Sequence, residues 1–116
     1  NDGLRGLDPE ETRRNLAGIL AVLTERRIPT LLAGMYAPPN LGGDYGATFD
    51  RLYPALAAEY GVPLYPFFLE GVAARPALNQ ADGIHPNAAG VAVIVEGITP
   101  HVVDMIERHR LAARDG

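Results

Sequence analysis

Three segments with helical periodicity alternate with two short apolar runs, and this alternation limits the fold more than any other feature of the chain. The apolar runs cover residues 30–36 and 62–68, and their length suits buried strands. The resulting order is helix, strand, helix, strand, helix. Such an order is typical of a parallel sheet with helices packed on its faces, so we expect an α/β fold.

The first helix is expected to begin after Asp8. Asp8 is a favourable N-cap, Pro9 fits the first helical position, and Glu11 stands where a capping box needs an acid. Four apolar residues then fall on one helical face: Leu16, Ile19, Leu20 and Leu23. Pro29 ends the segment, so a helix of about four turns is predicted.

The second helix is expected over residues 47–60, with Gly61 as its C-terminal stop. Pro54 lies inside this segment and predicts a kink or a break, because proline lacks the N–H that a helix interior uses. The predicted inner face consists of Phe49, Leu52, Tyr53 and Leu56.

The last helix is expected to begin after Asn87 and to bend or restart near Thr99, where Pro100 interrupts the hydrogen bonding. Its apolar positions step by three or four residues: Val91, Ile94, Ile98, Val102 and Met105. Two strands make a poor parallel sheet, since parallel strands are normally buried within a wider one. The pattern therefore predicts the back half of a doubly wound domain.

Composition excludes several classes of function. The 116 residues are 47% hydrophobic and 21% charged, as in an ordinary globular domain or a piece of one. The net charge is -4 and all ten basic residues are scattered arginines, so no nucleic-acid or membrane footprint is expected. The absence of cysteine excludes disulfides, thiolate metal sites and a cysteine nucleophile. The longest uninterrupted apolar runs are shorter than the ~20 residues that span a bilayer.

An Asp-x-x-His pair near the C-terminal third carries the clearest chemical signal. Asp82 precedes His85 by three residues on a turn, with Pro86 and a helix start directly behind the imidazole. The carboxylate can accept a hydrogen bond from Nδ1–H, which fixes the tautomer and presents Nε2 as a general base. The alternative is a surface turn in which Asp82 binds local backbone N–H groups.

A second cluster, Asn1-Asp2-Gly3, opens the chain. Asn, Asp and Gly are common turn residues, and this is the plain interpretation. The functional interpretation is that the Asn1 amide donates to a developing oxyanion.

Together, "NDGLRGL" at residues 1–7 and "DGIHPNAAG" at residues 82–90 resemble two characteristic blocks of the SGNH, or GDSL, hydrolases. The likeness extends through the intervening "RLYPALAAEYGVPL" and "VPLYPFF" and favours the branch of exported arylesterases, acyl thioesterases and lysophospholipases. It implies a flavodoxin-like three-layer α/β/α sandwich with a parallel sheet, no metal or organic cofactor, and a periplasmic or secreted location.

Carried over residue by residue, the resemblance implies that His85 is the general base, Asp82 its orienting acid and Asn1 the oxyanion-hole donor. Gly3 and Leu4 would belong to the loop, up to Leu7, that borders the acyl-binding crevice. The implied substrate is a small acyl ester or thioester.

The chain departs from the family pattern, because it lacks the Gly-Asp-Ser nucleophile block, a glycine-bearing second block and the glycine two residues before the oxyanion asparagine, and it contains no serine. The Gly-Asp-Ser nucleophile block would lie upstream of Asn1. None of the five threonines, Thr12, Thr24, Thr30, Thr48 and Thr99, stands in a nucleophile elbow. We therefore expect residues 1–116 to be the C-terminal portion of a single hydrolase domain, inactive without an upstream serine segment. The alternative is a non-catalytic α/β module that binds a partner or self-associates through an exposed sheet edge.

Overall fold

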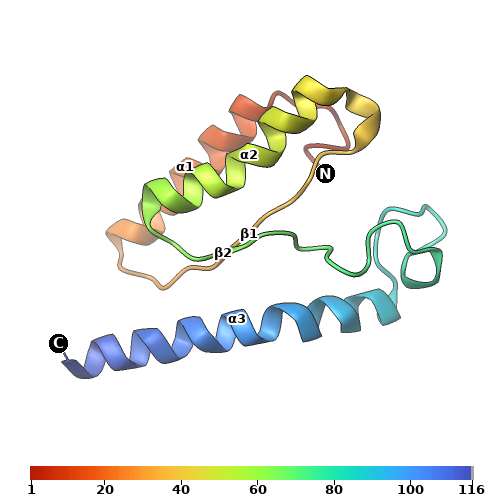
Figure 1. The fold of residues 1–116 in the computed structure, drawn as a ribbon. Helices are drawn as coiled ribbons and strands as arrows, with labels where there is room; N and C mark the ends of the chain where they lie inside the picture. Colours follow the sequence, from red (N-terminus) through yellow and green to blue (C-terminus); the bar gives the residue numbers. More distant parts are fainter. Residues whose placement is uncertain (116) are drawn as a thin grey trace. The chain divides into compact units, whose positions relative to one another are not determined.

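The computed structural model describes residues 1–115, except for the side chains of Pro39 and Asp115, and its helices and strands alternate as expected (Figure 1). The elements are α1 (Pro9–Glu25), β1 (Leu32–Ala33), α2 (Gly43–Tyr60), β2 (Leu64–Tyr65) and α3 (Ala88–Asp115). Two 3-10 helices, η1 (Pro39–Leu41) and η2 (Pro76–Leu78), lie in the connections. The predicted order of helices and strands is confirmed.

The chain forms two compact units, residues 1–66 and 67–116. The first contains α1, α2 and both strands. The second contains a turn-rich segment, η2 and α3. Each unit is described by itself below.

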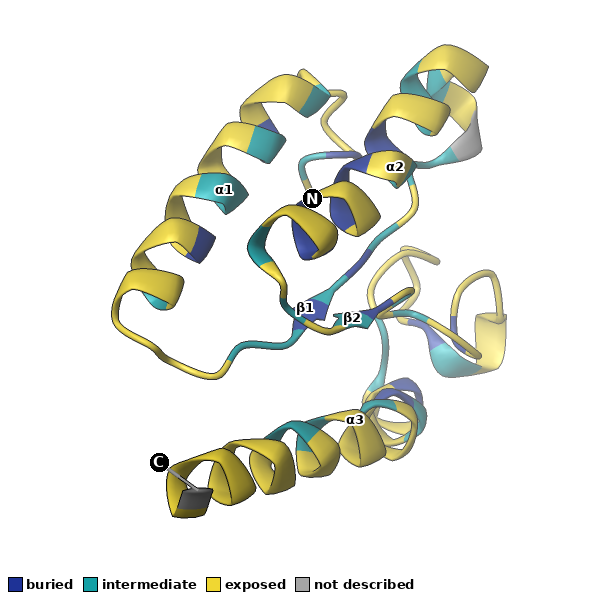
Figure 2. Ribbon diagram, turned by 60° about the vertical axis from the view of Figure 1, so that its left-hand side comes forward, coloured by how far each residue is buried: buried dark blue, intermediate teal, exposed yellow. Residues whose placement is uncertain are grey.

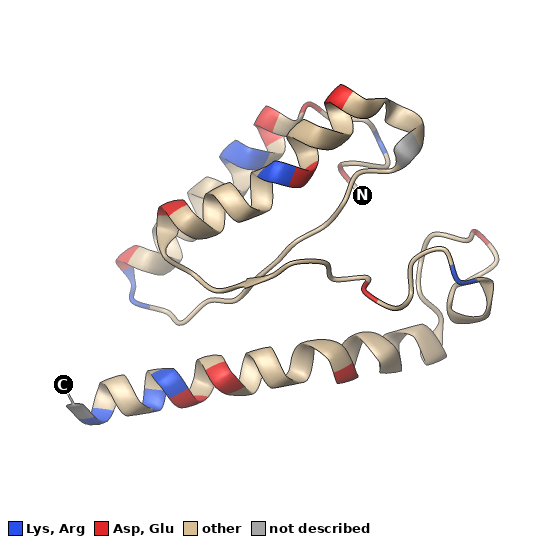
Figure 3. Cartoon of the chain, in the orientation of Figure 1, with Lys and Arg blue, Asp and Glu red and all other residues tan. Residues whose placement is uncertain are grey.

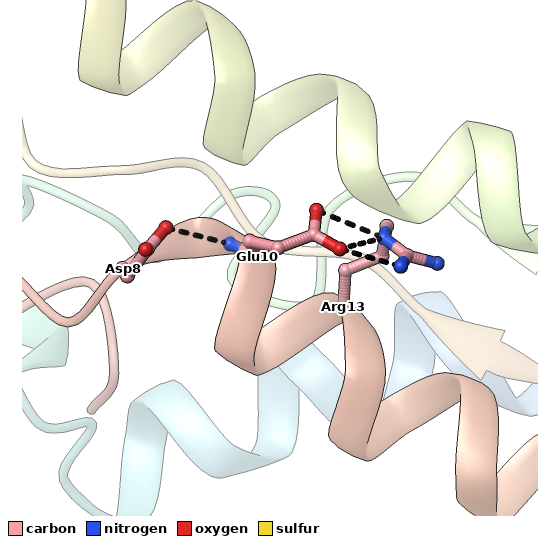
Figure 4. Close-up of polar contacts among 3 residues, drawn as sticks. All are labelled: Asp8, Glu10 and Arg13. Carbon is pink, nitrogen blue, oxygen red and sulfur yellow. Dashed lines mark hydrogen bonds and ion pairs between the residues drawn. The ribbon is translucent and has the colours of Figure 1, made fainter.

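Helix α1 begins where the local signals predict. The Asp8 carboxylate accepts a hydrogen bond of 3.0 Å from the backbone N–H of Glu10 (Figure 4). The Glu10 carboxylate in turn accepts from Nε of Arg13 at 3.0 Å. Because the first N–H groups of a helix lack intrahelical partners, the Asp8 carboxylate satisfies one of them and its charge favours the positive end of the helix dipole.

Helix α2 begins at Gly43, four residues before the predicted start, and ends at Gly61, which has the left-handed φ of 64°. The predicted break at Pro54 is wrong, because α2 is one continuous element. Pro54 is exposed, whereas the opposite side of the helix is buried. Packing of that side compensates for the one backbone hydrogen bond that the helix loses at the proline.

The core of the first unit lies between α1, α2 and β1. The facing sides of α1 and α2 carry its buried residues (Figure 2). Its members are Leu20, Leu32, Phe49, Leu52, Tyr53, Leu56 and Ala57. All four residues predicted for the inner face of the second helix belong to this core, so the periodicity identified the buried face correctly.

Strands β1 and β2 pair in parallel, with Leu32 opposite Leu64 and Ala33 opposite Tyr65. The Leu32 N–H donates to the Pro63 carbonyl at 2.9 Å. Helix α2 is the crossover connection between the two strands. Within residues 1–115 the sheet has two strands of two residues each, shorter than the apolar runs, because only residues with a ladder partner form a strand.

Helix α3 begins after Asn87 as predicted, since the Asn87 Oδ1 accepts from the Gly90 N–H at 2.9 Å. A restart near Thr99 is wrong, because the helix runs without interruption through Pro100. The Thr99 hydroxyl donates to the Val95 carbonyl one turn earlier, a bond that supports the backbone next to the proline.

Among the described residues, one helical stretch, Ala88–Arg114 of α3, is long and apolar enough to cross a membrane, and an 18-residue window within it has a mean hydropathy of 1.5. Glu96 and Pro100 interrupt this stretch, so no uninterrupted apolar run in the sequence indicates it. Ile94 is buried, whereas Val91, Val95 and Val103 on the same helix are about half exposed.

Candidate active site

The segment between η2 and α3 is a closed loop whose two ends bond to each other. Asn79 and Pro86 form an antiparallel bridge. The Gln80 N–H donates to the His85 carbonyl at 2.7 Å, and the Gln80 side chain donates to the Pro86 carbonyl at 3.1 Å. These bonds fix the backbone of His85 from the opposite arm of the loop.

Asp82 organises the tip of this loop. One carboxylate oxygen, Oδ1, accepts from the backbone N–H of Ile84 at 2.9 Å and from that of His85 at 3.0 Å. An aspartate that binds the N–H two residues on forms an Asx turn, which is the arrangement of the plain interpretation in the sequence. The turn leaves the second oxygen, Oδ2, for the imidazole.

The His85 Nδ1 lies 2.8 Å from Oδ2 of Asp82. The predicted side-chain hydrogen bond is therefore present together with the turn, and the two interpretations of this sequence are not exclusive. Both side chains are accessible, with 52% of the His85 and 43% of the Asp82 side-chain surface exposed. The pair therefore lies at the surface of its own unit.

The electrostatics of the pair follow from these three bonds. The hydrogen bond from the His85 side chain, followed by those from the backbone N–H groups of His85 and Ile84, lowers the pKa of Asp82 from 3.8 to about 2. Asp82 is therefore a carboxylate throughout the neutral range. A carboxylate at this distance keeps the proton on Nδ1 and stabilises the imidazolium when Nε2 takes a second proton.

Two asparagines attach the loop to the rest of the second unit. Asn79 is buried, and its amide donates to the carbonyls of Val72 and Arg75 at 2.9 and 2.8 Å. The Asn87 amide donates to the Ala77 carbonyl at 2.9 Å and also caps α3. Sequence reasoning identified the cap but missed Asn79 and Gln80, since no local pattern marks a side chain that binds distant carbonyls.

Gly90 allows the first turn of α3 to approach this segment closely. A Cβ at this position would stand 2.1 Å from the Leu78 carbonyl oxygen and 3.1 Å from Cβ of Pro86. Any side chain would therefore push the helix start away from the loop that carries His85.

Asn1 lies at the start of the first unit, on a compact loop of residues 1–7. The Arg5 N–H donates to the Asn1 carbonyl at 3.0 Å, and the Leu7 N–H donates to the Asp2 carbonyl at 3.1 Å. Gly3 is buried, whereas Leu4 is 44% exposed. The loop therefore has a defined backbone and presents Leu4 to solvent.

The structure thus brings Asp82 and His85 together, and it places Asn1, Gly3 and Leu4 on a loop of the other unit. Among residues 1–115 no group of three or more His, Cys, Asp or Glu side chains is arranged to hold a metal ion. Charged residues are spread along the helices and loops, and no large cluster of one sign gathers on either unit (Figure 3). The chemistry that this arrangement supports is proton transfer by an oriented imidazole.

Comparison with known proteins shows the family to which the chain belongs. The model of the GDSL-like lipase/acylhydrolase family matches residues 1–93. Esterase TesA of Pseudomonas aeruginosa is 42% identical over 100 residues, which cover 86% of this chain and 50% of the relative. Thioesterase 1/protease 1/lysophospholipase L1 of Escherichia coli K12 is 45% identical over 87 residues, 75% of this chain and 42% of the relative.

Solved structures of related esterases support the same family assignment. The crystal structure of TesA superposes with a TM-score of 0.84 at 40% identity, over 90% of this chain and 58% of that one. Esterase AlinE4, an SGNH-hydrolase family esterase, superposes with a TM-score of 0.68 at 54% identity, over 90% of this chain and 55% of that one. The chain spans about half the length of the relatives that it matches, and its small parallel sheet with flanking helices matches part of their fold. The chain belongs to the GDSL-like lipase/acylhydrolase family, in the branch of SGNH hydrolases that includes TesA, thioesterase 1 and arylesterase.

Proposed function

We propose that this chain supplies the acid–base pair and one oxyanion donor of a serine hydrolase that cleaves acyl esters and thioesters. The observation that carries the proposal is the 2.8 Å hydrogen bond between Nδ1 of His85 and Oδ2 of Asp82. That bond determines which ring nitrogen carries the proton and therefore which one can accept another. Relatives that carry the names esterase, thioesterase and arylesterase support the reaction class.

In the proposed mechanism a serine hydroxyl attacks the acyl carbonyl carbon while Nε2 of His85 takes the hydroxyl proton. The carbonyl oxygen becomes an oxyanion, to which the Asn1 amide donates a hydrogen bond. Collapse of this intermediate breaks the bond to the alcohol or thiol, which leaves with the proton from His85. Water then attacks the acyl-enzyme by the same sequence of proton transfers and releases the acid.

The nucleophile in this proposal lies outside the 116 residues, because the chain contains neither serine nor cysteine. Matched relatives are about twice as long as the aligned segment, which is consistent with this arrangement. We propose that residues 1–116 are the C-terminal portion of one hydrolase domain. An upstream segment would complete the flavodoxin-like three-layer α/β/α sandwich around the β1–β2 sheet.

The loop of residues 1–7 is proposed to border the acyl chain. Because Gly3 has no side chain, the backbone there lies close to α2, and the exposed Leu4 offers an apolar contact for a fatty acyl group. By its likeness to exported members of the family, the protein is proposed to act in the periplasm or outside the cell. The proposed reaction needs no metal or organic cofactor.

The test is complementation. The chain alone, and the chain mixed with the corresponding upstream segment, are assayed for hydrolysis of an aryl ester and an acyl thioester. We expect activity only in the mixture and none when His85→Ala replaces the wild-type chain. His109→Ala removes another exposed histidine, on α3, and is the matched control that should remain active. Hydrolysis by the chain alone, above the His85→Ala background, would refute the assignment of the nucleophile to an upstream segment.

The alternative is a non-catalytic module that self-associates, and the two-stranded parallel sheet favours it, since such a sheet leaves strand edges to pair. Sedimentation velocity over a range of concentrations distinguishes the two. Concentration-dependent association of the chain, together with an inactive mixture, supports the alternative. Association that the upstream segment abolishes supports the hydrolase proposal.

A further inference from the structure

The loop of residues 1–7 is fastened to α1 by one side-chain hydrogen bond that the proposed mechanism does not use. The Thr12 hydroxyl donates to Oδ2 of Asp2 at 2.9 Å. Thr12 is the fourth residue of α1 and only 5% of its surface is exposed. A buried hydroxyl is costly without a partner, so the bond to Asp2 stabilises both the helix start and the loop.

Two contacts from α2 hold other parts of the same loop. The Tyr45 hydroxyl donates to the Leu7 carbonyl, which fixes the end of the loop. At Gly3 an added Cβ would stand 3.3 Å from Cζ of Phe49, so the backbone lies directly against that ring. Tyr45 stacks on Phe49 with ring centroids 6.0 Å apart, an arrangement that stabilises this apolar surface.

The charge of Asp2 acts on two tyrosines of α2, Tyr45 and Tyr53, which both contact the Phe49 ring. Burial, and then the charge of Asp2, raise the pKa of Tyr45 and of Tyr53, the latter to about 12. Of the three anchors, only the bond between Asp2 and Thr12 acts on the residue next to Asn1. The other two act on Gly3 and Leu7, further along the loop.

We propose that Asp2 and Thr12 are positioning residues, whose hydrogen bond fixes the loop of residues 1–7 on α1 and thereby orients the Asn1 amide for the oxyanion. The inference rests on the proposed role of Asn1 as oxyanion donor. Neither residue touches substrate in this account. Thr12 acts through Asp2, and Asp2 acts through the backbone that it shares with Asn1.

The expected effect is large because an oxyanion donor works only within a narrow distance. Donors must lie about 2.7–3.1 Å from the oxyanion, and a misplacement of about 1 Å can lower a rate by about 10²-fold. A loosened loop affects the transition state more than the bound substrate, since the oxyanion forms only during the reaction. It should therefore lower kcat and leave KM nearly unchanged.

The test compares matched variants in the complemented protein. Thr12→Val keeps the shape of the side chain and removes the hydroxyl, Thr12→Ser restores the hydroxyl, and Asp2→Ala removes the acceptor at a partly exposed site. Thr24→Val is the control, because it makes the same change at an exposed position of the same helix. We expect Thr12→Val and Asp2→Ala to lower kcat by about 10-fold or more, with KM within about 2-fold. Thr12→Ser should recover most of kcat, and Thr24→Val should equal wild type.

Amide hydrogen exchange provides a readout that does not depend on activity. Arg5, Gly6 and Leu7 donate backbone hydrogen bonds within the loop. Their exchange should accelerate in Thr12→Val and Asp2→Ala but not in Thr12→Ser. The Val62 N–H, which donates to the Ala57 carbonyl at the end of α2, should keep its exchange rate and show that the fold is intact.

Three results would overturn the inference. Unchanged exchange of the loop amides in both Thr12→Val and Asp2→Ala would show that their bond does not hold the loop. Accelerated exchange with unchanged kcat would show that loop order does not position the donor. Accelerated exchange of the loop amides in the variants, together with a wild-type mixture that shows no hydrolysis, would refute the proposed function, and the positioning role with it, while the tether itself would stand.

Discussion

Asp82→Asn is the substitution that separates the two roles of the aspartate. The Asp82 Oδ1 binds two backbone N–H groups, at 2.9 and 3.0 Å, and Oδ2 binds the imidazole. Asparagine has one oxygen, which can keep both bonds to the backbone, and one amide nitrogen, which must then face Nδ1 of His85. The turn is preserved, but the partner of the ring changes from an acceptor to a donor.

The consequence is a reversed tautomer. Facing a donor, Nδ1 must accept, so the proton moves to Nε2 and the proposed base is lost. General acid–base catalysis contributes about 10²–10⁴-fold, and the same change in a serine protease triad lowers kcat by about 10⁴-fold. Here half of the His85 side chain is exposed, so water can also hydrogen-bond to the ring, and the loss in kcat should be smaller. We expect kcat of the complemented protein to fall by about 10²-fold, the lower end of that range.

Two measurements check this prediction. Steady-state hydrolysis of an aryl ester gives kcat, and long-range ¹H–¹⁵N correlation spectra of the ring give the tautomer. The Nδ1–H form should dominate in the wild type and the Nε2–H form in Asp82→Asn. Asp104→Asn is the matched control, since Asp104 is an exposed aspartate on α3 that pairs with Arg108.

Activity of Asp82→Asn within about 3-fold of wild type, together with a reversed tautomer, would refute the reasoning, because a base protonated on Nε2 cannot accept the serine proton. An unchanged tautomer would show that the asparagine side chain has turned over and that its nitrogen faces the backbone N–H groups instead. In that case the turn should loosen, and the N–H groups of Ile84 and His85 should exchange faster.

Three further predictions follow from burial and charge. The NMR signal of the Asp82 carboxyl carbon should titrate with a pKa of about 2, and this pKa should rise towards 3.8 in His85→Ala. Because the pKa of Asp82 is lower in the folded state, its ionisation stabilises the fold above about pH 4, and this contribution is lost as the pH falls through 2. Leu56→Ala should lower the free energy of unfolding in urea by about 2–5 kcal/mol, since Leu56 is 1% exposed in the core of the first unit, and a loss below 1 kcal/mol would indicate a loosely packed core. Spectrophotometric titration should show a phenol with a midpoint of about 12 that Tyr53→Phe removes; because this pKa is raised above 10.0, folding stability should fall as the pH rises past 10.

Features set by neighbouring residues could be predicted from the sequence. Asp8 and Asn87 cap helices within the next three residues, and the bond between Asp82 and His85 spans three. Such geometry depends on local backbone conformation, so a short pattern contains the information. The order of elements and the buried face of α2 were predictable for the same reason, because hydrophobic periodicity is local as well.

Features set by distant partners could not be predicted. Thr12 binds Asp2 ten residues away, and Asn79 binds the carbonyl of Val72. In the sequence, Thr12 and Asn79 look like any polar residues exposed on the surface. The continuity of α2 through Pro54 depends on the packing of the opposite face, which the proline itself does not reveal. The extent of β1 depends on its ladder partners in β2, more than thirty residues further along.

The closed loop of residues 79–87 holds the proposed acid and base together within one short segment of the chain. The hydrogen bonds between its acid and its imidazole lie within residues 82–85, and the ends of the loop bridge at Asn79 and Pro86. In the proposed hydrolase, a nucleophile from another segment would therefore meet an acid–imidazole pair that is already hydrogen-bonded. We expect that residues 79–87, grafted between two arms of matched spacing on an unrelated scaffold, keep the His85 ring in the Nδ1–H tautomer.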